Sequence, residues 1–235
     1  MMWYWQRLLV LVCLIANLAQ AYTADDVFKE FKQAYEKSKN FTAEFEETTI
    51  RNSNKGVAKG RISFSKPNLL RQEYVSQENP DNVVQLIVLD GNFSWSYTPF
   101  LNQINRMRMG DSRQKELIPG IGISLEGTEK NYNIELVLDE AAHKKGVYQL
   151  KLTPKPHLVV KSEGGLVVEE VLEIWIDTKD WLPVQFGYRS ETESGDKMSA
   201  VVALKNIKRN LKLNPKVFQF EVPKDAEIVD LTEEE

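Results

Sequence analysis

The side chains that most often carry out chemistry are scarce in this chain. His143 and His157 are its only histidines, and Cys13 is its only cysteine. Neither histidine has a partner at a spacing typical of metal ligands, so a metal site would need an all-carboxylate cluster, and none stands out. The sequence therefore predicts neither a metal site nor a cofactor.

Motifs of enzymes are missing as well. The stretch Gly122–Gly127 (GISLEG) has one residue too many for a G-x-S-x-G nucleophile elbow. The glycines of Pro119–Gly122 are not followed by the Lys-Ser/Thr pair of a phosphate-binding loop. Paired carboxylates such as Glu169 and Glu170 indicate a solvated strand face. We therefore predict no catalytic residues, and a binding protein in place of an enzyme.

Large apolar side chains at strand spacing are the strongest signal in the chain. Phe93, Trp95 and Tyr97 alternate with small polar residues, so they share one face of a strand. The preceding Asp90-Gly91-Asn92 tolerates positive φ, which predicts a hairpin between the two flanking runs. Another part of the chain or a ligand must cover this row of three aromatic side chains, because it would otherwise expose a large apolar surface to water.

One helix is predicted over Thr23–Lys39. Thr23 and Asp26 have the spacing of a capping box. Apolar residues recur at helical spacing and form one aromatic-rich stripe, consisting of Val27, Phe28, Phe31, Ala34 and Tyr35. This pattern predicts a helix that packs on a sheet.

Most of the remaining chain has the period of strands. After the Asp90 hairpin, strands are predicted over Asn133–Asp139, Tyr148–Thr153, Val167–Asp177, Pro183–Glu191, Lys197–Ile207 and Val217–Val222. Between Asn102 and Thr128 the pattern is irregular. A short helix over Asp111–Leu117 and an apolar stretch interrupted by glycines indicate a flexible flap.

The predicted elements define the fold class as α+β, and mostly β. Sequential strands favour an antiparallel meander, and a long sheet curls because twist accumulates across it. We expect an open (unclosed) β-barrel of about eleven strands with an α-helical lid.

The N-terminal residues predict a signal peptide. Arg7 precedes an apolar run from Leu8 to Ala16, which is followed by Ala19-Gln20-Ala21. We expect residues 1–21 to be removed, leaving one domain over residues 22–235. Cys13 would leave with the signal, and its acylation is disfavoured because Val12 precedes it. The net charge of -4 and the lack of a long basic run give no indication of nucleic-acid binding.

An ordered set of residues resembles the periplasmic outer-membrane lipoprotein carrier (LolA) family. The set is a Gly-Arg-x-x-Phe strand, Lys-Pro, an Arg-x-x-Tyr strand, an Asp-Gly hairpin and Trp-x-Tyr-x-Pro. It consists of Gly60, Arg61, Phe64, Lys66, Pro67, Arg71, Tyr74, Asp90, Gly91, Trp95, Tyr97 and Pro99. The stretch Phe218–Pro223, followed by Asp225 and Asp230, resembles the closing strand of the same family.

This resemblance implies a function that needs no catalysis. A monomeric periplasmic carrier would take lipoproteins from an ABC-type exporter of the inner membrane and deliver them to an outer-membrane acceptor. Their acyl chains would lie in an apolar cavity beneath the lid, because each methylene hidden from water is worth about 0.8 kcal/mol. The alternative is a periplasmic sensor or regulatory domain of the same fold, which binds a lipid or a protein.

The expected acyl-chain site combines the helix stripe with the aromatic strands. Its predicted lining is Phe28, Phe31, Phe64, Leu70, Phe93, Trp95 and Tyr97, with the flap residues Ile118, Ile121 and Ile123. The same side chains can equally fill a dry core, and burial energy does not distinguish the two arrangements. The resemblance also assigns a lid latch to Lys66, although an ordinary surface lysine remains the alternative. Lysine lacks the forked hydrogen bond of the arginine often found at this position.

Overall fold

The structure is a computed structural model that describes residues 22–109, 125–158, 161–162 and 165–232. The predicted signal peptide 1–21, the helix over Asp111–Leu117 and the flap residues Ile118, Ile121 and Ile123 lie outside the described residues.

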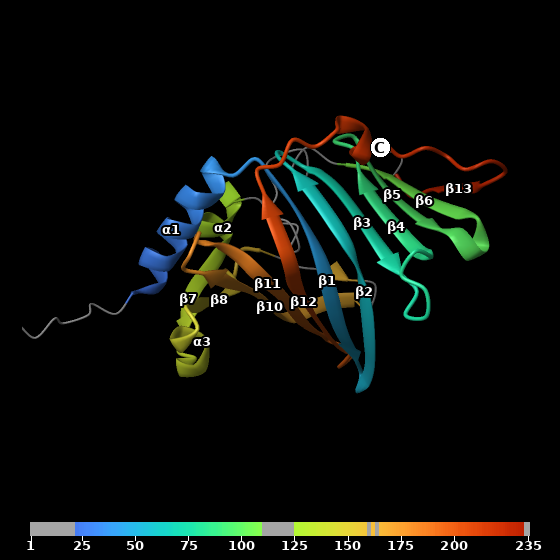
Figure 1. Cartoon of the computed structure of the whole chain (residues 1–235). Coiled ribbons are helices and arrows are strands. Elements are labelled where there is room, and N and C mark those ends of the chain that lie inside the picture. Colours follow the sequence, from blue (N-terminus) through green and yellow to red (C-terminus); the bar gives the residue numbers. More distant parts are fainter. Residues whose placement is uncertain (1–21, 110–124, 159–160, 163–164, 233–235) are drawn as a thin grey trace, which may run out of the picture.

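One curved, unclosed sheet makes up most of the fold (Figure 1). From one end to the other its path is β13 (Glu227–Asp230), β6 (Gln103–Arg108), β5 (Phe93–Thr98), β4 (Val83–Leu89), β3 (Leu69–Val75), β2 (Asn54–Ser65), β1 (Asn40–Arg51), β12 (Lys197–Arg209), β11 (Leu182–Thr192), β10 (Gly165–Asp177), β8 (Val147–Pro154) and β7 (Tyr132–Val137). The short β9 (Lys161–Ser162) pairs with β10 beside this path. The expected mostly-β fold with an unclosed curved sheet is confirmed, although β13 pairs with β6 in parallel.

The predicted helix is α1 (Ala24–Lys37), and its N-terminus is capped as expected. The Thr23 hydroxyl accepts a hydrogen bond from the Asp26 amide, and the Asp26 carboxylate accepts one from the Thr23 amide. The remaining helical segments are short: α2 (Leu125–Asn131), α3 (Glu140–Lys144), η1 (Pro99–Leu101) and η2 (Pro215–Phe218).

The predicted hairpin joins β4 to β5 and depends on Asp90. One oxygen of its carboxylate accepts hydrogen bonds from the amides of Asn92, at 2.9 Å, and Phe93, at 2.7 Å. Gly91 has a φ of 97°, a conformation that favours glycine. The other Asp90 oxygen accepts the indole N–H of Trp95 at 2.7 Å. The turn therefore also fixes the indole ring of Trp95 on β5.

The main core lies on the concave face of the sheet. Phe41 of β1, Phe64 of β2, Ile174 of β10 and Phe186 of β11 belong to one buried cluster with the α1 stripe. Helix α1 contacts β7, β8 and β11 directly. Because strands from both halves of the path surround the same cluster, the sheet wraps around α1 and its stripe.

Gly60 of β2 allows two rings to meet across the strand between them. It pairs with Phe45 of β1 on one side and with Tyr74 of β3 on the other. The two rings lie 5.1 Å apart, edge to face. A Cβ atom at Gly60 would lie 1.9 Å from the Glu73 carbonyl oxygen and 2.7 Å from the Phe45 ring. Only glycine leaves room for this close approach.

The predicted closing strand Val217–Val222 is wrong. Phe218 ends η2, and the chain is irregular from there until β13 begins at Glu227. The alternation of Phe218 and Phe220 has another cause, since Phe218 is buried and Phe220 stacks on Trp95. The alternation therefore reflects two side chains that pack against the molecule, whereas the backbone between them forms no strand of the sheet.

We expect Gly60→Ala to lower the free energy of unfolding by at least about 2 kcal/mol, because the added methyl group overpacks a site closed by backbone. Urea denaturation measures this loss. The matched control is Gly56→Ala on the same strand, where an added Cβ meets nothing within 4 Å. The control should stay within about 0.5 kcal/mol of the wild type. Equal losses in the two variants would contradict the packing argument.

Candidate functional site

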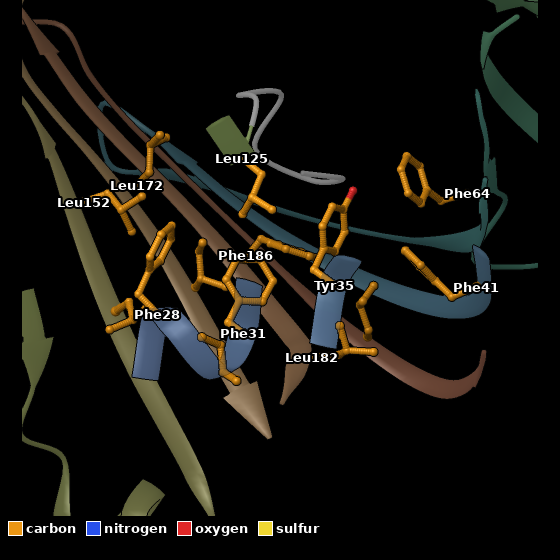
Figure 2. Packing of buried hydrophobic residues seen from close by; sticks show 14 of the residues in the cluster. Phe28, Phe31, Tyr35, Phe41, Phe64, Leu125, Leu152, Leu172, Leu182 and Phe186 are labelled. Atoms are coloured by element: carbon orange, nitrogen blue, oxygen red, sulfur yellow. The ribbon is translucent and has the colours of Figure 1, made fainter. Parts of the chain in front are cut away.

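The concave face carries four of the seven predicted lining residues. Phe28 and Phe31 of α1 are buried in the main cluster, as is Phe64 of β2. Leu70 of β3 pairs with Phe64 and packs against the same cluster. Figure 2 shows the rings of α1 among Leu152, Leu182 and Phe186 on one side, with Phe41 and Phe64 beyond Tyr35.

The other three predicted lining residues lie on the opposite, convex face. Leu70 pairs with Leu89 of β4, whereas Trp95 of β5 pairs with the neighbouring Val88. Successive side chains of a strand point to opposite faces. Phe93, Trp95 and Tyr97 therefore share the face that does not carry the α1 core. The structure does not bring the seven residues together.

The aromatic row of β5 is covered by the C-terminal segment. The Phe220 ring stacks on Trp95 at 5.0 Å between centroids, with 17° between the planes, and meets Tyr97 edge-on at 6.2 Å. The Arg106 guanidinium lies over Phe93 at 5.2 Å and over Trp95 at 5.7 Å. These contacts make the row a docking face for the chain's own C-terminal segment.

Arg106 also joins this face to β13. Its guanidinium pairs with the carboxylate of Asp230. Hydrogen bonds from Thr232, together with that guanidinium, lower the pKa of Asp230 to about 2. The ion pair therefore persists across the physiological pH range.

The concave face also offers apolar surface that α1 covers only in part. Half-buried side chains surround the main cluster and pack against it; among them are Leu70, Tyr74, Ile134, Leu136, Tyr188 and Val202. Leu125, the first residue of α2, reaches the cluster from the other side and is buried (Figure 2). Sequence reasoning placed Leu125 in the apolar flap and missed the helix that follows it.

Two carboxylates border this apolar surface. The Tyr74 hydroxyl donates to Glu47 at 2.7 Å, and Gln72 donates to the same hydroxyl at 2.9 Å. Burial, followed by the bond to Glu47, raises the pKa of Tyr74, so its hydroxyl stays protonated. Such groups can hydrogen-bond the polar end of an amphipathic ligand.

Glu170 forms the second carboxylate site, and the sequence reading of a solvated strand face is wrong for it. Glu170 lies two residues before Leu172 on β10, and Leu172 is buried in the concave cluster. Side chains two residues apart on a strand share a face, so Glu170 also points to the concave face. There it accepts a hydrogen bond from the Tyr132 hydroxyl at 3.3 Å. Burial raises the pKa of Glu170, although the bond from Tyr132 favours its charged form.

Lys66 connects the end of β2 to the end of α1. Its ammonium group donates to the Glu36 carbonyl oxygen at 3.3 Å and lies 4.5 Å from the centre of the Tyr35 ring. The last carbonyls of a helix lack intrahelical partners and carry partial negative charge, so a cation is favourable there. At the surface between α1 and α2, Lys32 pairs with Glu129 at 3.1 Å.

Neither a metal cluster nor a membrane-spanning helix is found in the described part of the chain. Within those ranges, no group of three or more His, Cys, Asp or Glu side chains is arranged to hold a metal ion. None of the helices there has the length and apolar character needed to cross a bilayer.

Comparison with known proteins relates this geometry to a family. Residues 36–221 match the family described as "Outer membrane lipoprotein carrier protein LolA". The outer-membrane lipoprotein carrier protein of Glaesserella parasuis serovar 5 (strain SH0165) is 27% identical, over 89% of this chain and 88% of its own length. The protein of the same name from Haemophilus ducreyi (strain 35000HP / ATCC 700724) is 25% identical, over 94% and 93%.

Solved structures with some similarity cover most of the chain. An uncharacterised conserved protein from Thermus thermophilus has a TM-score of 0.48 at 17% identity, over 88% of this chain and 98% of that one. The MucA/MucB complex of Pseudomonas aeruginosa contains a chain with a TM-score of 0.43 at 14% identity, over 84% and 61%.

The family match spans far more than half of the sequence. The family and its curated members are named as carriers, which supports a lipoprotein-carrier role in general and a binding function over catalysis. The chain belongs to the LolA family of outer-membrane lipoprotein carrier proteins.

Proposed function

We propose that this protein is a periplasmic carrier that binds the acyl chains of lipoproteins released from the inner membrane and delivers them to an outer-membrane acceptor. One observation carries the proposal. Among the described residues, the aromatic stripe of α1 covers part of the concave face of an unclosed sheet, and its contacts with the strands are mainly apolar. Acyl chains can replace such contacts.

Exchange of the α1 stripe for acyl chains requires little net energy. Apolar contacts are non-directional and scale with the area removed from water. A stripe that leaves the concave face is replaced there by methylenes worth about 0.8 kcal/mol each. The closed and loaded states can therefore lie close in free energy, which is what uptake and release both need. Glu47, Tyr74 and Glu170 at the border would contact the polar part of the cargo.

The proposal includes the partners and the compartment. The cargo is handed over by an ABC-type exporter in the inner membrane, and the carrier works as a monomer between the two membranes. The seven predicted residues divide accordingly: Phe28, Phe31, Phe64 and Leu70 would contact acyl chains, whereas Phe93, Trp95 and Tyr97 hold the C-terminal segment.

A matched pair of leucines tests the acyl-chain site. Leu70 lies half-buried on the concave face of β3, and Leu86 lies half-buried on the convex face of β4, paired with Tyr97. We expect Leu70→Asn to weaken binding of a fluorescent fatty-acid probe about tenfold, since it removes apolar contact worth roughly 1.5 kcal/mol. Leu86→Asn should leave probe binding unchanged.

Circular dichroism and thermal melting confirm that both leucine variants fold. Trp95→Ala serves as a second variant on the convex face and should also bind the probe normally. Equal weakening by Leu70→Asn and Leu86→Asn, or no binding by the wild type, would refute a concave acyl-chain site.

The latch role of Lys66 is testable through its contacts with the Glu36 carbonyl and the Tyr35 ring. We expect Lys66→Leu to fold, to lose about 1 kcal/mol of stability and to accept cargo normally, because it removes one charge-assisted bond and one cation–π contact at a half-exposed site. Release should be impaired, since a lid that re-closes less readily gives less drive for hand-over. Lipoprotein transfer to acceptor membranes measures both steps.

Lys66→Arg is the matched control for the latch, because it retains the cation and can bond the Glu36 carbonyl. It should restore release. If Lys66→Leu loads and releases as the wild type does, Lys66 has no part in the mechanism and is an ordinary surface residue.

The proposed compartment depends on cleavage after Ala21. We expect the protein recovered from the periplasm to begin at Tyr22 and to carry no lipid. Intact mass spectrometry measures this, and a mass that includes acyl chains on Cys13 would replace the soluble carrier with a membrane-anchored protein.

A further inference from the structure

The turn between β5 and β6 presents two large apolar side chains to water. Phe100 is 95% exposed and Leu101 is 60% exposed, both in η1. The hairpin ends at an edge of the molecule far from α1 (Figure 1). A single exposed apolar residue is ordinary in a soluble protein, but two adjacent ones at the tip of a hairpin form a small apolar protrusion.

This protrusion is held rigidly. Asn102 adopts a left-handed conformation with φ 47°, and its amide donates to the Pro99 carbonyl at 3.1 Å. The Tyr97 hydroxyl donates to the Asn102 side chain at 3.0 Å. That side chain in turn donates to the carbonyls of Lys224, at 3.3 Å, and Asp225, at 2.8 Å. The turn is thus fixed to the C-terminal segment, and its two apolar side chains stay outside.

The chemistry of the hairpin favours lipid over protein as the occupant. No charged residue occurs from Gly91 to Asn105, in a chain with 27% charged residues, so insertion of the tip desolvates no side-chain charge of the hairpin. A stable protein interface needs roughly 800 Å² from each partner and several paired polar groups, which two apolar side chains do not supply. A bilayer requires only apolar surface.

We propose that Phe100 and Leu101 insert into the interfacial layer of a lipid bilayer and hold the carrier there while cargo passes. This inference rests on the proposed carrier function for its purpose, but the contact itself needs no cargo. Two side chains give weak, reversible attachment, as a single short acyl anchor does. A carrier that has to leave again requires attachment of that strength.

The test uses one fluorescent label in two positions. Phe100→Cys and Leu138→Cys are each made in a chain whose Cys13 is absent or replaced by alanine, and each is labelled with an environment-sensitive dye. Leu138 is the matched control because it is 83% exposed but stands alone, beside Asp139 and Glu140. With protein-free phosphatidylcholine vesicles, we expect a blue shift and brighter emission at position 100 and no change at position 138.

A label-free variant completes the experiment. Phe100→Ser/Leu101→Ser should co-sediment with the same vesicles about a hundredfold less than the wild type, since each of the two large side chains withdrawn from lipid costs about a factor of ten. Its binding of the fatty-acid probe in solution should be unchanged. If the wild type does not bind the fatty-acid probe, the carrier function is refuted, whereas the membrane contact is still judged by the vesicle experiment.

Three outcomes would overturn the inference. The first is an unchanged spectrum at position 100 at millimolar lipid. The second is a response only to cell membranes that proteinase treatment abolishes, which would assign the tip to a protein partner. The third is a response to rising protein concentration without lipid, which would assign it to a second copy of the chain.

Discussion

The concave apolar face of an unclosed sheet has to be covered, and the other features of this protein depend on how that is done. Twist accumulates along a path of twelve strands and curls the sheet, while β7 and β13 stand at its two ends. A closed barrel shields its interior with hydrogen bonds between strands. Here α1 shields it with side chains, so the cover is held by contacts that other apolar groups can replace.

The convex face has a cover of a different physical kind. The C-terminal segment lies on Trp95 and Tyr97, but it is also tied down by directional bonds: Asn102 binds two of its carbonyls, and Arg106 pairs with Asp230. Removing this segment would leave polar groups without partners, which is costly. Directional bonds thus hold the cover of the convex face, whereas mainly apolar contacts hold α1 on the opposite face of the same sheet.

The sequence predicted what depends on local periodicity and missed what depends on register. The α1 stripe, its cap and the hairpin at Asp90 are set by neighbouring residues. The face taken by Trp95 depends on pairing through β4 to β3, so the alternation of β5 alone could not assign it. The four-residue β13 is too short to show a period, and Glu170 looks like any acidic strand residue until its neighbours are known.

The geometry of α1 determines how its cover could open. Only residues 38 and 39 separate α1 from β1, and Asn40 is anchored by two hydrogen bonds with the backbone of Leu211. The C-terminal end of α1, where Lys66 binds, would therefore be the pivot of such an opening. Phe28 lies about 15 Å along the axis from that pivot, at 1.5 Å per residue, and moves further than Tyr35 for the same rotation. The half-exposed Lys32–Glu129 pair would resist this rotation little, so the apolar contacts of the stripe and the bonds of Lys66 would set the balance between a closed and an open position.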